Sequence, residues 1–130
     1  MLHFQQPNGH QTRIGQNSDA YQGCLVVSPS TGFRAFFANS AQANSFLSHC
    51  PPGSSVHPCQ VDWVPPAGIY VAGNFGNPHY AWPTNCAIVL ANADQSFVGL
   101  FQNLSDATTF AAVQALYGVP CTAYTGSLQS

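Results

Sequence analysis

The stretch CLVVSPSTGFRAFFANSAQANSF, residues 24–46, decides the fold because residues 86–110, CAIVLANADQSFVGLFQNLSDATTF, follow nearly the same pattern. Each stretch has a short apolar run, turn residues, a second run containing Phe, and then Ala and Phe at helical spacing. A Pro-Cys pair ends each copy, and Cys24 to Cys59 and Cys86 to Cys121 have the same separation, 35 positions. The matches indicate one structural unit present twice. Chance similarity between two amphipathic segments is the alternative.

Each copy predicts the element order β-β-α-β. CLVV and CAIV are apolar runs bounded by turn residues, and the Phe-containing runs after them are the return strands of hairpins. Asn39 and Asn103 are candidate N-caps of the helices, and Gly118 is a helix stop. The alternating segments CQVDWV and CTAYTGSL close the units as strands.

We therefore expect an α+β fold in which two β-β-α-β repeats pack about a pseudo-two-fold axis as a single domain, because neither half can bury its sheet and helix alone. The expected boundaries are an extended N-terminal arm at 1–22, the first repeat at 23–64, a connecting loop rich in Pro, Gly and aromatic residues at 65–85, and the second repeat at 86–130.

Charge is nearly absent from the chain. Its 130 residues include 2 Arg, 4 Asp, no Lys and no Glu, so only 5% are charged against about one quarter in typical soluble domains. Two Arg cannot form a phosphate-binding patch or a polybasic lipid-binding cluster, which argues against nucleic-acid and membrane partners. Asn, Gln, Ser and Thr supply the polar surface instead. A nearly neutral surface favours packing against copies of the chain or against a partner, although it also suits a secreted protein.

The first residues are polar and contain no apolar segment typical of a signal peptide. We expect synthesis in the cytoplasm and a final location in a virion or another extracellular particle. Polar termini normally fray unless they are held, so we expect residues 1–22 to lie on a neighbouring subunit.

Five cysteines are many for this length. The repeat predicts two disulfides, Cys24–Cys59 and Cys86–Cys121, each joining the first and last strands of a unit. A rival scheme joins Cys50 to Cys59 and leaves Cys24 free. In a third alternative all five are buried thiols, as is usual in the cytosol.

The motif HCPPGSSVHPC suggests a zinc site with His49, Cys50, His57 and Cys59 as ligands, but its spacing fits no common zinc motif, so we predict no metal and no other cofactor. A catalytic interpretation would use a Cys nucleophile, one of two histidines as base and one of two aspartates as the orienting group. These candidates are His57, His79, Asp62 and Asp94. No nucleophile elbow, phosphate-binding loop or metalloprotease motif accompanies them, so we predict no catalytic residues.

Aromatic residues in the arm and the connecting loop are the interface candidates, because aromatic side chains anchor many protein contacts. They are Phe4, Tyr21, Tyr70, Phe75, Tyr80 and Trp82. The alternative is that the loop aromatics cover the core.

The leading hypothesis is a non-enzymatic structural protein that assembles with itself or with other subunits of a particle, such as a phage coat, decoration or tail component. The first alternative is a secreted, disulfide-stapled binding module that uses Trp63, Tyr80 and Trp82. The second is a small Cys/His hydrolase or zinc protein.

Overall fold

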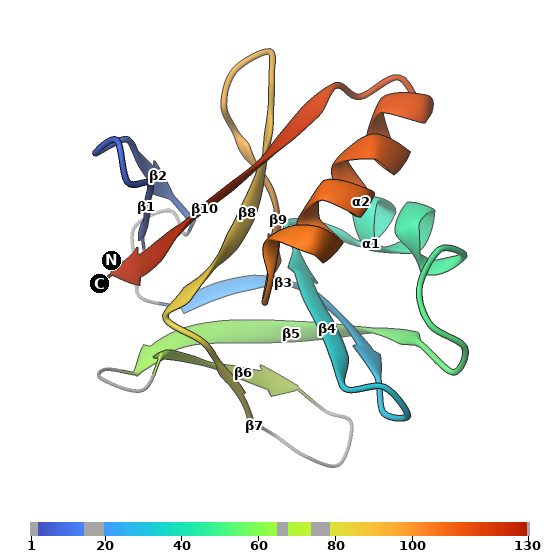
Figure 1. The fold of residues 1–130 in the computed structure, drawn as a ribbon. Helices are drawn as coiled ribbons and strands as arrows, with labels where there is room; N and C mark the ends of the chain where they lie inside the picture. Colours follow the sequence, from blue (N-terminus) through green and yellow to red (C-terminus); the bar gives the residue numbers. More distant parts are fainter. Residues whose placement is uncertain (1–2, 15–19, 65–67, 74–78, 130) are drawn as a thin grey trace.

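A computed structural model describes residues 3–14, 20–64, 68–73 and 79–129, and it describes the side chains within these ranges except those of 20–22, 60–64, 68–73 and 79–81. The described residues form a mixed α+β fold in a single domain, which confirms the expected class (Figure 1). The elements in chain order are β1 (His3–Gln5), β2 (Gln11–Arg13), β3 (Ala20–Ser28), β4 (Phe33–Phe37), α1 (Ser40–Leu47), β5 (Ser55–Val64), β6 (Gly68–Gly73), β7 (His79–Trp82), β8 (Asn85–Ala91), β9 (Phe97–Phe101), α2 (Leu104–Leu116) and β10 (Cys121–Gln129).

Turn residues set the two central hairpins. Gly32 adopts a positive φ of 73° between β3 and β4, a conformation that costs glycine little. In the β8–β9 hairpin Gln95 has φ 58°, and the Asp94 carboxylate accepts a hydrogen bond from the Ser96 backbone N–H at 3.0 Å. The register also shifts after Val89. The second hairpin is therefore irregular where the first is regular.

Both predicted helix caps are present. The side chain of Asn39 accepts a hydrogen bond from the backbone N–H of Gln42 at 3.1 Å, and that of Asn103 accepts one from Asp106 at 2.9 Å. Each cap satisfies a backbone donor that the first helical turn leaves unpaired. The Gly118 stop lies just after α2, where it adopts a positive φ of 84°.

The ten described strands form one antiparallel sheet in the order β2-β1-β10-β8-β9-β4-β3-β5-β6-β7. The β4–β9 ladder joins the two central hairpins. Phe36 lies opposite Leu100 in this ladder, with Ala35 opposite Phe101 and Phe37 opposite Gly99.

The sheet carries a buried apolar cluster on each face. Helices α1 and α2 cover one face, where Phe37, Phe46, Phe101 and Phe110 pack with ring centroids 4.9–6.2 Å apart. The other face carries a second cluster that includes Phe36, Leu100 and Trp82. Figure 1 shows β8 and β10 crossing β3 and β5 steeply, with both helices on one side. The sheet therefore curls around the second cluster and carries the helices outside.

The N-terminal segment differs from the expected arm. In residues 3–13, β1 and β2 form a hairpin, and β1 pairs with the end of β10 of the same chain, with Phe4 opposite Leu128. Phe4 is fully buried and Ile14 is 3% exposed, and both belong to the cluster inside the curl. Burying these two side chains keeps the segment on its own sheet.

The connecting segment 65–85 is not simply a loop. Ile69 and its neighbours form β6, which extends over Gly68–Gly73 and pairs with β5, and β7 pairs with β6 at the edge of the sheet. Only two residues separate β7 from β8, and the backbone carbonyl of Thr84 between them accepts a hydrogen bond from the Leu128 N–H at 2.9 Å. This segment therefore connects the edge strand β7 directly to the interior strand β8.

Candidate functional site

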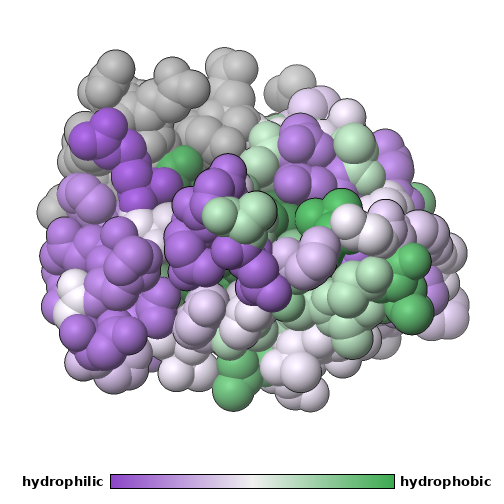
Figure 2. Space-filling view, turned by 90° about the horizontal axis from the view of Figure 1, so that it is seen from above, coloured by the Kyte–Doolittle hydropathy of each residue, from purple (hydrophilic) through white to green (hydrophobic). Residues whose placement is uncertain are grey.

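The outer face of α2 is the main apolar surface of the described residues. All four exposed large hydrophobic side chains belong to this helix or to the turn after it. They are Leu104, Leu116, Tyr117 and Val119, and Leu116 is 84% exposed. In Figure 2 hydrophobic colour gathers on the helix side, whereas the side of the N-terminal hairpin is hydrophilic.

The exposed residues of α2 include no charged side chain. Between the two leucines they are Ser105, Thr108, Thr109, Ala112 and Ala115, and Asp106 is only half-exposed. A surface helix usually places charged or polar groups on its solvent face. Depletion of charged side chains is typical of the core of a protein–protein interface.

Strand β10 runs beside this helix and has an open edge. It pairs with β8 over Cys121–Ser127 but with β1 only over Ser127–Gln129. On its β1 side, no strand in the described part of the chain pairs with residues 121–126. Unpaired strand edges expose backbone donors and acceptors that can pair with another chain.

A groove of about 350 Å³ separates α2 from β10. Small side chains line it: Thr108, Ala111, Ala112, Ala115, Cys121, Thr122 and Ala123. The helix face, the groove and the open edge thus adjoin one another and form what we call the α2–β10 surface.

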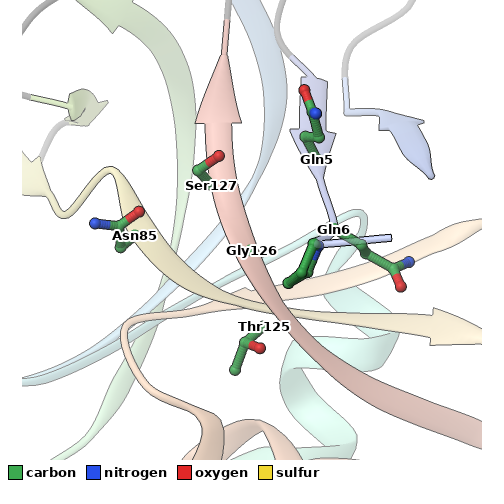
Figure 3. Close-up of a pocket in the computed structure, with 7 residues that line it drawn as sticks. Gln5, Gln6, Asn85, Thr125, Gly126 and Ser127 are labelled. Carbon is green, nitrogen blue, oxygen red and sulfur yellow. The ribbon is translucent and has the colours of Figure 1, made fainter. Parts of the chain in front are cut away.

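A polar hollow of about 410 Å³ lies where β1 leaves β10 (Figure 3). Figure 3 shows its side chains coming from β1, β8 and β10 around the bare backbone of Gly126. The lining residues are Gln5, Gln6, Pro7, Asn85, Thr125, Gly126 and Ser127. No charged group lines the hollow, although amides and hydroxyls are abundant there.

A second hollow of about 260 Å³ shares three residues with the first, Asn85, Thr125 and Gly126. It continues to the start of α2 through Gln102, Asn103 and Leu104. The Asn103 amide is already occupied as the helix cap, and its Nδ2 donates to the Asp106 carboxylate at 2.9 Å. The uncommitted polar groups therefore lie mainly in the first hollow.

The strand register excludes the predicted Cys86–Cys121 disulfide. Cys86 lies opposite Gly126, whereas Cys121 lies opposite Ala91, five positions away along the same ladder. Five strand residues span about 16 Å, far beyond the Cα separation that a disulfide allows, about 7 Å at most.

The Cys24–Cys59 prediction is also wrong, as is the rival Cys50–Cys59 scheme. Cys24 and Cys50 pack with the helix-side cluster, whereas Cys59 belongs to the cluster on the opposite face of the sheet. All five cysteines are free, and Cys24, Cys59 and Cys86 are buried. The buried-thiol alternative therefore fits these three, whereas Cys50 and Cys121 are only partly buried.

Burial controls the acidity of these thiols. It raises the pKa of Cys59 to about 12, with a smaller contribution from the neighbouring Cys24, and raises the pKa of Cys50 to about 11. Burial also raises the pKa of Cys86 to about 12, and the Trp82 indole opposes this shift without reaching hydrogen-bond geometry. Thiols with raised pKa values are protonated near neutral pH and are poor nucleophiles and metal ligands.

The residues considered for metal binding or catalysis are dispersed. His57 Nε2 lies 2.8 Å from the Ser55 hydroxyl, and His49 stacks on Phe46 with centroids 6.3 Å apart. Asp94 lies in the β8–β9 turn, where hydrogen bonds from Ser96 lower its pKa. Within the described residues, no three His, Cys, Asp or Glu side chains form a group that could hold a metal. The structure does not describe the side chains of Asp62 and His79.

Two interface candidates are core residues. Phe4 and Trp82 are fully buried inside the curl of the sheet, so neither can contact a partner from the surface of the folded chain. For Trp82 the alternative of core coverage is correct. Phe75 and the side chains of Tyr21, Trp63, Tyr70 and Tyr80 lie outside the description.

The sequence prediction missed both the α2 surface and the polar hollow. The exposed hydrophobics of α2 are scattered among residues that also fit a buried helix. The lining of the hollow comes from three segments that only strand pairing brings together. The sequence LSDATTFAAVQALYGV, in which Asp106 is the single charged residue, was an available signal for the helix face.

No family model, curated protein or solved structure matches the chain. Among the described residues, no helix has the length and apolar character needed to cross a membrane.

Proposed function

We propose that this chain is a non-enzymatic structural subunit that assembles through the α2–β10 surface. The carrying observation is that every exposed large hydrophobic side chain in the described residues lies on α2 or its C-terminal turn. These side chains flank a helix face without charge. Covering the face removes apolar area from water and leaves no charge unpaired.

A second copy of the chain is the partner that fits this surface best. Leu104 and Leu116 lie at opposite ends of α2, about 18 Å apart at 1.5 Å per residue. In an antiparallel two-fold pair, each of these leucines meets the other leucine of the partner helix. Ala112 and Ala115 between them permit close approach, and the open edge of β10 allows a strand contact alongside. The absence of charge on this face removes like-charge repulsion between identical copies.

We also infer that the β-β-α-β units are related by a pseudo-two-fold axis through the Phe36–Leu100 pair. The β4–β9 ladder supports this inference, because exchanging the units converts the Ala35–Phe101 pair into Gly99–Phe37. The hairpin registers then match Cys24 with Ala87, since each of these residues lies opposite the last Phe of its return strand, Phe37 or Phe101. The sequence match of Cys24 with Cys86 is thus one residue out of step.

A particle component, such as a phage coat, decoration or tail protein, remains the proposed class. Its supports are the near-neutral composition and an uncharged surface suited to packing of identical subunits. The proposed location is accordingly the assembled particle.

The test is sedimentation velocity of the full-length chain over a range of concentrations, alongside Ala112→Glu and Ala41→Glu. Both alanines are exposed on helices, but only Ala112 lies in the proposed contact. We expect the wild-type chain and Ala41→Glu to associate as concentration rises, and Ala112→Glu to remain monomeric. A wild-type monomer at every concentration, or equal association by both variants, would overturn the proposal.

A further inference from the structure

We propose that the polar hollow between β1, β8 and β10 binds a neutral saccharide. Its lining offers five amide or hydroxyl side chains, four from β1, β8 and β10 and one from Gln6 just after β1, together with the ring of Pro7. At about 410 Å³ the hollow falls within the usual range for small-molecule sites, about 300–1,000 Å³.

The absence of charge in the lining selects the class of ligand. A phosphate or carboxylate ligand needs Arg, Lys or a comparable set of donors, and a cation needs carboxylates. The lining has none of these groups. An apolar ligand would leave the amides without partners, which is costly when they are desolvated.

A saccharide hydroxyl both donates and accepts hydrogen bonds, as does a side-chain amide. The amides of Gln6 and Asn85 and the hydroxyl of Thr125 make no hydrogen bond with any described residue. Gln6 is only 6% exposed, so most of its side chain packs against the protein. Gln5 and Ser127 make only long hydrogen bonds, of 3.3 and 3.4 Å, to other glutamines. These groups can turn toward a ligand at little cost.

Gly126 fixes the shape of the hollow. A Cβ at this position would collide with the Gln5 backbone carbonyl and would lie 2.7 Å from the Phe4 ring. Glycine therefore lets β1 cross closely over β10 before the chain turns away at Pro7. The divergence of these two strands opens the space between them.

The experiment measures binding of uncharged oligosaccharides by ligand-observed NMR and calorimetry. The probes are maltotriose, chitotriose, cellotriose and a galactotriose, each titrated against the full chain. We expect saturable binding of at least one probe, and about three- to tenfold weaker binding in Thr125→Val and Asn85→Asp, since each substitution alters one hydrogen-bonding group. Asn44→Asp is the matched control, because Asn44 is exposed on α1, away from the hollow. It should bind like the wild-type chain.

Three outcomes would overturn the proposal: no binding of any probe, equal affinity in all variants, or saturable binding of an uncharged extended peptide in place of the sugars. The last would reassign the hollow to peptide recognition beside the open edge of β10. Ala112→Glu should retain saccharide binding, so failure of this proposal is distinguishable from failure of the assembly proposal.

Discussion

Phe36 of β4 lies directly opposite Leu100 of β9, and both side chains are fully buried inside the curl of the sheet. Their ladder is the connection between the two central hairpins. Gly23 lies against the Phe36 ring, and a Cβ there would come within 2.6 Å of Phe36 Cζ. The pair therefore joins the halves of the domain through packing that leaves little room for adjustment.

Truncating either member of this pair should strongly destabilise the domain. We expect Phe36→Ala to lower the free energy of unfolding by about 3–5 kcal/mol and Leu100→Ala by about 2–5 kcal/mol, since each leaves a cavity. Urea denaturation followed by fluorescence measures both values. A loss below 1 kcal/mol in either variant would show that the halves do not depend on this contact.

The N-terminal hairpin should stabilise the folded monomer, contrary to the expectation for an arm that lies on a neighbour. Because Phe4 is fully buried, Phe4→Ala should lower the free energy of unfolding by about 3–5 kcal/mol. His10→Ala, at an exposed site in the same hairpin, is the control and should change stability by less than about 0.5 kcal/mol. Equal stability of Phe4→Ala and wild type would restore the arm model.

A hydrogen bond links the two helices, with Gln114 Nε2 donating to Ser45 Oγ at 2.8 Å. Gln114 is only 4% exposed, and the Ser45 hydroxyl donates onward to the Gln42 carbonyl at 2.9 Å. A double-mutant cycle with Gln114→Ala and Ser45→Ala should give a coupling energy of about 0.5–1.5 kcal/mol. Strictly additive effects would mean that the bond contributes nothing net.

The two asparagine caps should make comparable contributions. Asn39→Ala and Asn103→Ala should each lower the free energy of unfolding by about 0.5–2 kcal/mol. Serine at either position should preserve most of the stability that the asparagine cap provides. Thermal unfolding by circular dichroism measures the series. A serine variant as unstable as the alanine variant would argue against the capping role.

Stability should decline in alkaline solution as the buried thiols ionise. The pKa of Cys59 rises from 9.0 to about 12 on folding, as does that of Cys86, so the folded chain holds these protons at pH values where the unfolded chain releases them. The contribution of these thiols to the free energy of unfolding is complete below pH 9 and is lost as the pH rises toward 12. Urea unfolding at several pH values should show a shallower decline in Cys59→Ala and Cys86→Ala than in wild type. If stability declined equally steeply with pH in the variants and in wild type, ionisation of these thiols would not be the cause of the decline.

Local sequence signals predicted the central elements well. Strands β3, β4, β8 and β9 and both helices lie where apolar runs, turn residues and the Asn caps place them. These elements depend on neighbours within a few residues, whose chemistry is visible in the sequence. The helix stop at Gly118 is of the same kind.

The orientation of the cysteine side chains was harder to predict, because the match of Cys24 with Cys86 rested on residue identity alone. Matching Cys24 with Cys86 placed the two thiols on one face of the sheet, whereas they lie on opposite faces. A slip of one residue reverses the orientation of every side chain in a strand. The Cys24–Cys59 and Cys86–Cys121 predictions rested on this match, and the β3–β5 and β8–β10 registers place neither pair for a disulfide.

Contacts between distant segments were not visible in the sequence. The β1–β10 pairing joins residues from the two ends of the chain, and nothing local to residues 1–14 specifies that partner. Trp82 likewise lies in a segment rich in Gly and Pro that resembles a loop, yet it fills the core. The polar hollow arises from the same long-range pairing, which is why it was missed.

The short link from β7 to β8 has a kinetic consequence. Edge strands usually fray alone, so their amide protons exchange with solvent sooner than those of central strands. Here the edge strand β7 continues through two residues into the interior strand β8, and Thr84 in that link is bonded to β10. Lifting β7 from the edge pulls Trp82 out of the core and strains the start of β8. We therefore expect the edge and the middle of the sheet to open together, and the β7 amides that bond to β6 should exchange on the timescale of β8 rather than on that of a free edge.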